Sequence, residues 1–271
     1  MAGLTPWLQL GQRILHLEEL PALLERTQLL TPLFRRLLLE QCVVGIEVSA
    51  DEQMAFQQRF LARQGIESGE QLQAWLRERG LSEEQASRNI LETLQLERFK
   101  QQRFGAEVDR LFLATKGQRD RVVYSLLRVK EAAAAQELYL RLEEGDATFT
   151  ELAGEHSQGS ERETGGLIGP VLMGRLHPKL AELLRISKPG QLWHPIELDD
   201  WWVVVRLDKS LPAQLDGAME QQIRDELFEQ WLQTQLDALL QAYRSAAAQA
   251  GTEESPVAPP GNATTDLQPP Q

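Results

Sequence analysis

The feature that most constrains this fold is an apolar stripe near the end of the chain. Between residues 213 and 247, apolar side chains recur three to five positions apart, as they do on one face of a long helix. The stripe consists of Leu215, Met219, Ile223, Leu227, Trp231, Leu236, Leu239 and Tyr243. A single helix cannot bury such a stripe, because helices in proteins take most of their stability from packing on neighbours. The chain must therefore supply a partner surface.

Partner helices are predicted within residues 1–119. Three helix starts carry a serine followed three residues later by Glu or Gln, the pattern of a reciprocal N-terminal cap. These serines are Ser49, Ser68 and Ser82. If the C-terminal helix packs on these helices, the segment between them is an insertion into a helical domain.

The inserted segment differs in composition from its flanks. The run VVYSLLRV at 122–129 is apolar and β-branched, which predicts a strand. Further strands are predicted at 191–198 and 201–209, and helices at 130–145, 148–157 and 177–187. We therefore expect an α+β chain, in which a mainly helical domain holds a small inserted β/α domain and a long C-terminal helix.

The expected boundaries follow from these changes. The N-terminal helical domain takes residues 1–119 and the inserted domain takes 120–212. The helix at 213–248 is expected to pack on the N-terminal domain. The last stretch, 249–271, is rich in Pro, Thr and Gly and is expected to be disordered.

Charge and composition exclude several classes of protein. A net charge of -12 disfavours nucleic acid as a partner, because phosphate binding needs clustered Lys and Arg. The single cysteine, Cys42, excludes a disulfide or a Cys-based zinc site within one chain. No helix carries two histidines at ligand spacing, so neither a metal nor another cofactor is expected.

The start of the chain also carries an expectation. It lacks a basic segment followed by an apolar one, as in a signal peptide, and no stretch approaches the ~20 apolar residues of a membrane span. We therefore expect a cytoplasmic protein with no membrane insertion.

Six pieces of the middle segment, in this order, resemble the parvulin family of PpiC-type peptidyl-prolyl cis/trans isomerases, or rotamases. They are YSLLRV, TFTELAGEHS, TGGLIG, HPKL, SKPGQLWHPIEL and WWVVVRL. The flanking helices resemble those of multidomain foldases and chaperones of the SurA and PrsA kind. The resemblance implies that Gly165 and Gly166 let the chain enter a strand beside the substrate groove, since glycine adopts conformations closed to other residues.

The resemblance also implies where an active site lies. The two family histidines fall at Ser125 and Val203, the family Cys or Asp falls at Gly159, and these three are the catalytic candidates. The substrate-binding candidates are Leu127, Ser157, Leu176, Leu180 and Trp202, with Leu176 and Leu180 at the Met and Phe of the proline pocket. The polar identities are replaced, whereas the pocket positions stay apolar. Because a strand alternates its faces, Trp201 and Trp202 are expected to point in opposite directions.

Three functional hypotheses result. The first is a parvulin-type peptidyl-prolyl isomerase that acts as a protein foldase, with catalysis weak or lost. The second is a non-catalytic chaperone or adaptor that binds unfolded or Pro-containing polypeptide segments, with secretion as one setting. The third is a helical scaffold with an inert insertion.

Overall fold

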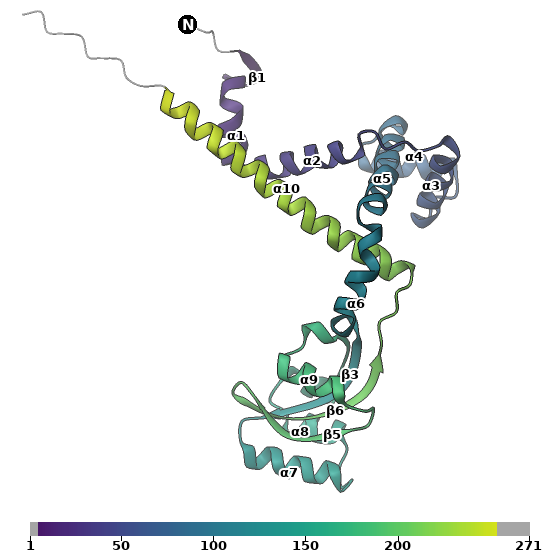
Figure 1. Ribbon diagram of the computed structural model, residues 1–271, viewed down its shortest axis with the longest axis vertical. Coiled ribbons are helices and arrows are strands. Elements are labelled where there is room, and N and C mark those ends of the chain that lie inside the picture. The colour runs from purple at the N-terminus through teal and green to yellow at the C-terminus, as the bar shows by residue number, and fades with distance from the viewer. Residues whose placement is uncertain (1–4, 254–271) are drawn as a thin grey trace, which may run out of the picture. The chain divides into compact units, whose positions relative to one another are not determined.

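The computed structural model describes residues 5–253, which divide into two compact units (Figure 1). The first unit comprises the chain up to Arg103 and the chain from Asp225 onward, and the second comprises Phe104–Arg224. The predicted fold class is confirmed, since a mainly helical chain holds one small sheet domain. Among the described residues, no helix is both long enough and apolar enough to span a membrane.

The first unit begins with a β-hairpin, which the sequence did not predict. Its strands are β1 (Pro6–Leu10) and β2 (Arg13–His16), which pair antiparallel from Pro6 with His16 to Leu10 with Arg13. The turn is possible because Gly11 adopts a φ of 60°, a left-handed conformation that favours glycine. The expectation that residues 1–119 are wholly helical is therefore wrong at residues 6–16.

Helices make up most of the rest of this unit. They are α1 (Leu20–Arg26), α2 (Leu30–Val43), α3 (Ala50–Arg63), α4 (Gly69–Arg79), most of α5 (Glu83–Phe104) and most of α10 (Gly217–Glu253). The predicted caps are confirmed: Ser49, Ser68 and Ser82 each accept a hydrogen bond from the backbone N–H three residues later. These bonds satisfy amide donors that a helix start leaves without intrahelical partners.

Helix α10 packs against α2 and α5 through aromatic side chains. Phe228 is 2% exposed, and its ring meets Phe99 of α5 edge-on with 6.2 Å between centroids. Farther along, Tyr243 meets Phe34 of α2 at 5.5 Å. The helix continues to Glu253, five residues beyond its predicted end at 248. Residues 254–271 of the predicted tail lie outside the described residues.

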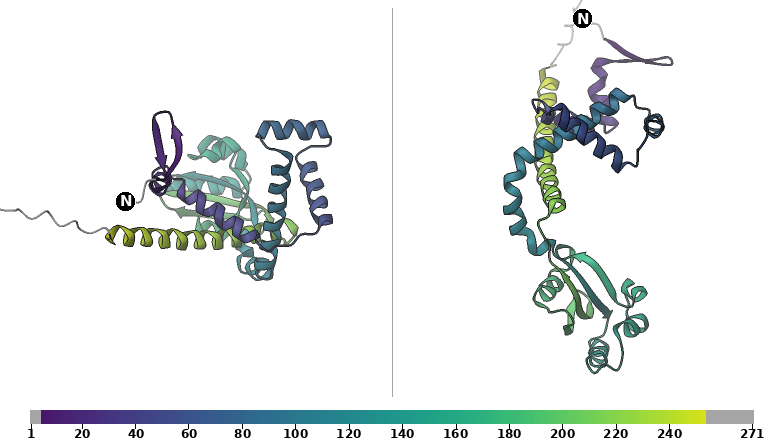
Figure 2. Two further views of the ribbon diagram at one scale, coloured as in Figure 1. Left: turned by 90° about the horizontal axis from the view of Figure 1, so that it is seen from above. Right: turned by 90° about the vertical axis from the view of Figure 1, so that its right-hand side faces the viewer.

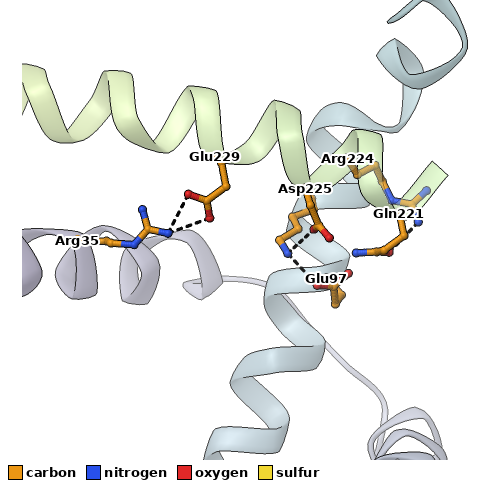
Figure 3. A network of polar contacts seen from close by, with 7 residues as sticks. Arg35, Glu97, Gln221, Arg224, Asp225 and Glu229 are labelled. Carbon is orange, nitrogen blue, oxygen red and sulfur yellow. Dashed lines mark hydrogen bonds and ion pairs between the residues drawn. The ribbon is translucent and has the colours of Figure 1, made fainter. Parts of the chain in front are cut away.

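Ion pairs also join α10 to α2 and α5 (Figure 3). Arg35 of α2 donates to Glu229 of α10 at 2.8 Å. Lys100 of α5 donates to Asp225 of α10 at 2.7 Å and to Glu97 at 2.9 Å. Burial lowers the pKa of Lys100, but the hydrogen bonds to the two carboxylates outweigh burial, so the pKa lies above its ordinary value.

The second unit is built on a four-stranded antiparallel sheet in the order β4-β3-β6-β5. Its strands are β3 (Arg121–Val129), β4 (Leu167–Leu172), β5 (Leu192–Leu198) and β6 (Trp201–Leu211). Its helices are α6 (Val108–Arg119), α7 (Ala132–Glu143), α8 (Phe149–His156) and α9 (Pro178–Ile186). Helices α7 and α8 cover one face of the sheet and α9 covers the other, as the right-hand view of Figure 2 shows.

The two glycines before β4 have different roles. Gly165 ends a short 3-10 helix with a φ of 60°. At Gly166 a Cβ would lie 2.9 Å from the Leu126 carbonyl oxygen and 3.0 Å from the Ala153 Cβ. The carbonyl of Gly166 also accepts a hydrogen bond from the Leu126 N–H at 2.9 Å. The chain can therefore enter β4 close to β3 only with a glycine at this position.

The two outer strands of the sheet share one feature. Strand β4 contains Pro170 and strand β5 contains Pro195. Proline has no backbone N–H, so neither residue can donate a backbone hydrogen bond to another strand.

We expect Phe228→Ala to destabilise the first unit by about 3–4 kcal/mol, because it removes a buried ring and leaves a cavity between α5 and α10. Gln230→Ala, at an exposed position of the same helix, is the control and should change the free energy of unfolding by less than about 0.5 kcal/mol. Urea unfolding with circular dichroism detection measures both. Equal effects of the two substitutions would contradict the packing of α10 on α5.

Candidate functional site

The two faces of the sheet define where any site in the second unit can lie. On the α9 face, Tyr124, Leu126 and Val203 pack into one core cluster with helix residues such as Leu180. On the α7/α8 face, Leu127 and Val204 pack into a second cluster with both helices. This separation follows from the alternation of side chains along β3 and β6.

The predicted site residues are divided between these faces. Val203, Leu176 and Leu180 are brought together on the α9 face. Leu127 and Trp202 belong to the cluster on the opposite face, and Ser125 lies two residues before Leu127 on the same strand. Ser125 and Val203, which the resemblance places at the two family histidines, therefore lie on opposite faces of the sheet. The physical reason is that a one-residue difference in the placement of a motif on a strand reverses the face.

The apolar positions on the α9 face are core residues. Leu180 is 4% exposed and Val203 is 3% exposed, and both pack against Val205, which is fully buried. Leu176 is half-buried against the same cluster. These side chains have the apolar character that a proline pocket needs. They fill the core between the sheet and α9.

The loop after α8 carries a polar cluster on the α9 side of β3. Arg128 donates from Nε to Glu161 Oε1 at 2.9 Å and from a terminal nitrogen to Oε2 at 2.6 Å. Ser157 donates from Oγ to the same carboxylate, and its Oγ accepts from the Arg128 N–H at 3.1 Å. Glu161 is 3% exposed and Ser157 is 1% exposed, so a nearly dry ion pair ties the loop to the strand.

Gly159 lies inside this cluster. A Cβ at this position would lie 2.1 Å from the Nε of Arg128 and 2.3 Å from a carboxylate oxygen of Glu161. The residue expected at the position of the family Cys or Asp is therefore a glycine because the guanidinium of Arg128 occupies the space. The fold brings Ser157 and Gly159 together at Arg128. Val203 of β6 pairs with Arg128 of β3.

The pKa shifts of Glu161 and Arg128 both favour the charged forms that make up the ion pair. Burial raises the pKa of Glu161, but the hydrogen bonds from Arg128 and Ser157 outweigh burial, so the pKa lies below its ordinary value. The hydrogen bond with Glu161 raises the pKa of Arg128. Both groups are charged at neutral pH, so neither serves as a proton donor or acceptor there. The pair can hold the loop, but it does not supply acid–base chemistry.

Trp201 forms a cation–π platform beside this cluster. The Lys130 ammonium lies 3.8 Å from the centroid of the Trp201 ring, and the Arg128 guanidinium carbon lies 5.9 Å from it. Trp201 packs with the α9-face cluster and Trp202 with the α7/α8-face cluster. The predicted opposite orientation of the two tryptophans is confirmed.

Ser125 lies instead at a cavity of about 920 Å³ on the α7/α8 face. The floor is a row of one residue from each strand, because Ser125 pairs with Leu167 on one side and with Arg206 on the other, and Arg206 pairs with Leu192. Phe149 and Thr150 of α8 stand beside the row.

A hydrogen-bonded group fixes Ser125 in this cavity. Its hydroxyl donates to Asp208 at 2.7 Å, and Asp208 accepts from Arg206 Nε at 2.8 Å. The Arg206 guanidinium lies 5.1 Å from the ring centroid of Phe149. The sequence analysis missed Arg206 and Asp208. Two charged residues at alternate positions of an otherwise apolar strand could have indicated a polar site on one face of that strand.

Metal binding has no candidate among residues 5–253. They contain no group of three or more His, Cys, Asp or Glu side chains that could hold an ion. The histidines at 156 and 177 each lie near one carboxylate at 3.5 and 3.7 Å, but these are isolated pairs.

Comparison with known families decides the identity of the sheet unit. Residues 124–209 match the model of the rotamase family described as the PPIC-type PPIASE domain. This segment is a PPIC-type peptidyl-prolyl isomerase domain. The predicted parvulin resemblance is confirmed for this segment. A comparison with curated proteins finds no match.

Several solved structures align with most of this chain at low sequence identity. PrsA from Bacillus cereus is 16% identical, with 88% of this chain and 91% of that chain covered and a TM-score of 0.44. PrsA from Bacillus anthracis is 20% identical, with 78% and 97% covered and a TM-score of 0.40. A structure of the SurA-like chaperones PEB4 and Cj1289 from Campylobacter jejuni is 15% identical, with 89% and 98% covered and a TM-score of 0.36.

We expect Arg128→Met to destabilise the PPIase domain by about 2–3 kcal/mol, because it leaves the Glu161 carboxylate buried without its partner. The lower end of this range reflects the partial exposure of Arg128. The double variant Arg128→Met/Glu161→Gln should recover part of the loss, because it removes the unpaired charge. Hydrogen exchange of the β3 amides measures both effects, and unchanged protection in the single variant would contradict the role of the ion pair.

The ion pair also predicts a pH dependence. Because the folded-state pKa of Glu161 is lowered, its stabilisation is complete above the unfolded-state pKa of about 4.3 and is lost as the pH falls through the lower folded-state value. Wild type should therefore exceed Glu161→Gln in unfolding free energy at pH 7, and the difference should shrink in strong acid. A difference that stays constant between neutral pH and pH values below the folded-state pKa would contradict this assignment.

Proposed function

We propose that this chain is a parvulin-type foldase that acts on unfolded or Pro-containing polypeptide segments mainly by binding them, with slow prolyl isomerisation. The domain belongs to a family of peptidyl-prolyl isomerases. The observation that carries the proposal is the match of residues 124–209 to this family. Two of the three positions that the resemblance assigns to catalysis, Gly159 and Val203, have no polar side chain.

The chemistry of isomerisation makes this loss important. Amide resonance sets a barrier of about 18–20 kcal/mol to rotation about a peptide bond. A catalyst must bind the twisted amide better than the planar one, through an apolar pocket and well-placed polar groups. Here Val203 and Gly159 have no polar side chain, and the Ser125 hydroxyl belongs to the opposite face and donates to Asp208. These three positions therefore offer no hydrogen bond to an amide on the α9 face.

The alternative is a chaperone or adaptor with no isomerase activity. The Arg128–Glu161 pair favours it, because these two side chains are already paired and leave few free donors beside Gly159, the position that the resemblance assigns to catalysis. A cytoplasmic location, expected from the sequence, stays part of the proposal, and cell fractionation checks it.

Exchange NMR on a short X-Pro peptide tests the proposal, with aggregation of an unfolded client followed in parallel. We expect suppressed aggregation, peptide shift changes, and cis/trans exchange only a few-fold faster than the uncatalysed rate, which is slow at tens to hundreds of seconds. Acceleration of several hundredfold would overturn slow catalysis. Absence of both client binding and acceleration would favour the inert scaffold.

Ser125→Ala separates the two faces in the same assays. Because Ser125 lies on the α7/α8 face, we expect the substitution to leave peptide exchange and client binding unchanged. A loss of exchange in this variant would restore Ser125 to the catalytic role that the sequence resemblance implied.

A further inference from the structure

The helical unit contains a groove that the PPIase domain does not explain. It lies between α3, α4 and α5, has a volume of about 550 Å³, and is lined by the apolar side chains Leu61, Leu72, Trp75, Ile90 and Leu91. The left-hand view of Figure 2 shows the three helices as a group of blue ribbons. We call this feature the α3–α5 groove. Its volume suits a few side chains of a bound segment.

Trp75 is held rigidly in the wall of the groove. Its ring meets Phe60 of α3 edge-on with 6.2 Å between centroids, and the Arg79 guanidinium carbon lies 4.5 Å from its centroid. The indole N–H is buried and has no acceptor among the described residues. A buried donor without a partner costs about 1–3 kcal/mol. Trp75 therefore contributes its apolar ring to the groove wall, and this nitrogen lies beneath the surface.

The rim of the groove combines an adaptable apolar side chain with carboxylates. Met54 does not line the groove, but it is 54% exposed and lies three and seven residues before the lining residues Gln57 and Leu61, on the same face of α3. Methionine adapts its shape to varied partners. Glu83 and Glu84 from the first turn of α5 line the other side of the groove, together with Arg88.

We propose that the α3–α5 groove binds an apolar segment of a client polypeptide that carries Lys or Arg beside its apolar side chains. The inference rests on the proposed foldase function and names the site that holds the client. The apolar walls take the client side chains, and Glu83 and Glu84 at the groove favour a neighbouring cation. The C-terminal segment 254–271 does not fit this description, since its charged side chains are Glu254 and Asp266.

Two matched substitutions test the groove in the full chain. Gln57→Trp places a large side chain in the groove, whereas Gln58→Trp places the same side chain on the exposed surface next to it. The probes are two fluorescein-labelled twelve-residue peptides, one built of Leu, Phe and Lys and one with every Lys replaced by Glu. Fluorescence anisotropy measures their dissociation constants.

We expect wild type and Gln58→Trp to bind the Lys peptide alike, and Gln57→Trp to bind it at least fivefold more weakly. The Lys peptide should bind wild type at least fivefold more tightly than the Glu peptide, and Glu84→Lys should reduce this preference. Equal affinities of Gln57→Trp and wild type would overturn the groove as the client site. Equal binding of the two peptides by wild type would overturn the basic character of the client.

Further readouts keep this inference separate from the proposed function. If wild type suppresses client aggregation while Gln57→Trp binds the Lys peptide like wild type, the foldase stands and the groove is wrong. If wild type neither binds peptide nor suppresses aggregation, the proposed function itself fails. Light scattering that shows a wild-type dimer dissociated by Gln57→Trp but not by Gln58→Trp would mean that a second copy covers the groove, which also overturns the inference.

Discussion

The antiparallel pairing of β3 with β6 is the constraint on which the PPIase domain depends. It joins two segments about 80 residues apart and runs from Arg121 with Leu211 to Val129 with Trp202. This pairing determines which side chains face α9 and which face α7 and α8. It therefore determines the residues of both core clusters and the face on which the cavity with Ser125 lies. The domain keeps the family architecture because this register buries one apolar set on each face.

The fold could be read from the sequence to a large extent. Apolar periodicity identified the C-terminal helix, serine caps identified the starts of α3, α4 and α5, and β-branched runs identified β3, β5 and β6. The N-terminal hairpin was missed because its strands are short. Strand β4 was found only through the family resemblance, since its glycines and proline hide any alternation.

The site was less predictable, for a physical reason. Matching YSLLRV to a family motif aligns each residue with a family position, but it does not determine which face of the sheet that residue occupies. The face depends on the pleat and on the bulge between Val123 and Tyr124. The place of Gly159 could not be understood without Arg128, because the guanidinium reaches that position from another element. In this structure the Arg128 side chain lies at Gly159 and ties the loop to β3 through Glu161.

The prolines at the edges of the sheet have a consequence for how this protein can meet unfolded chains. A sheet with open borders offers any extended polypeptide a template, and a foldase with such borders would risk seeding the fibres that it should prevent. Pro170 and Pro195 each remove one backbone donor from a border strand. Under the proposed function, this favours binding of clients through their side chains over pairing with the sheet backbone, and such binding is more readily reversed.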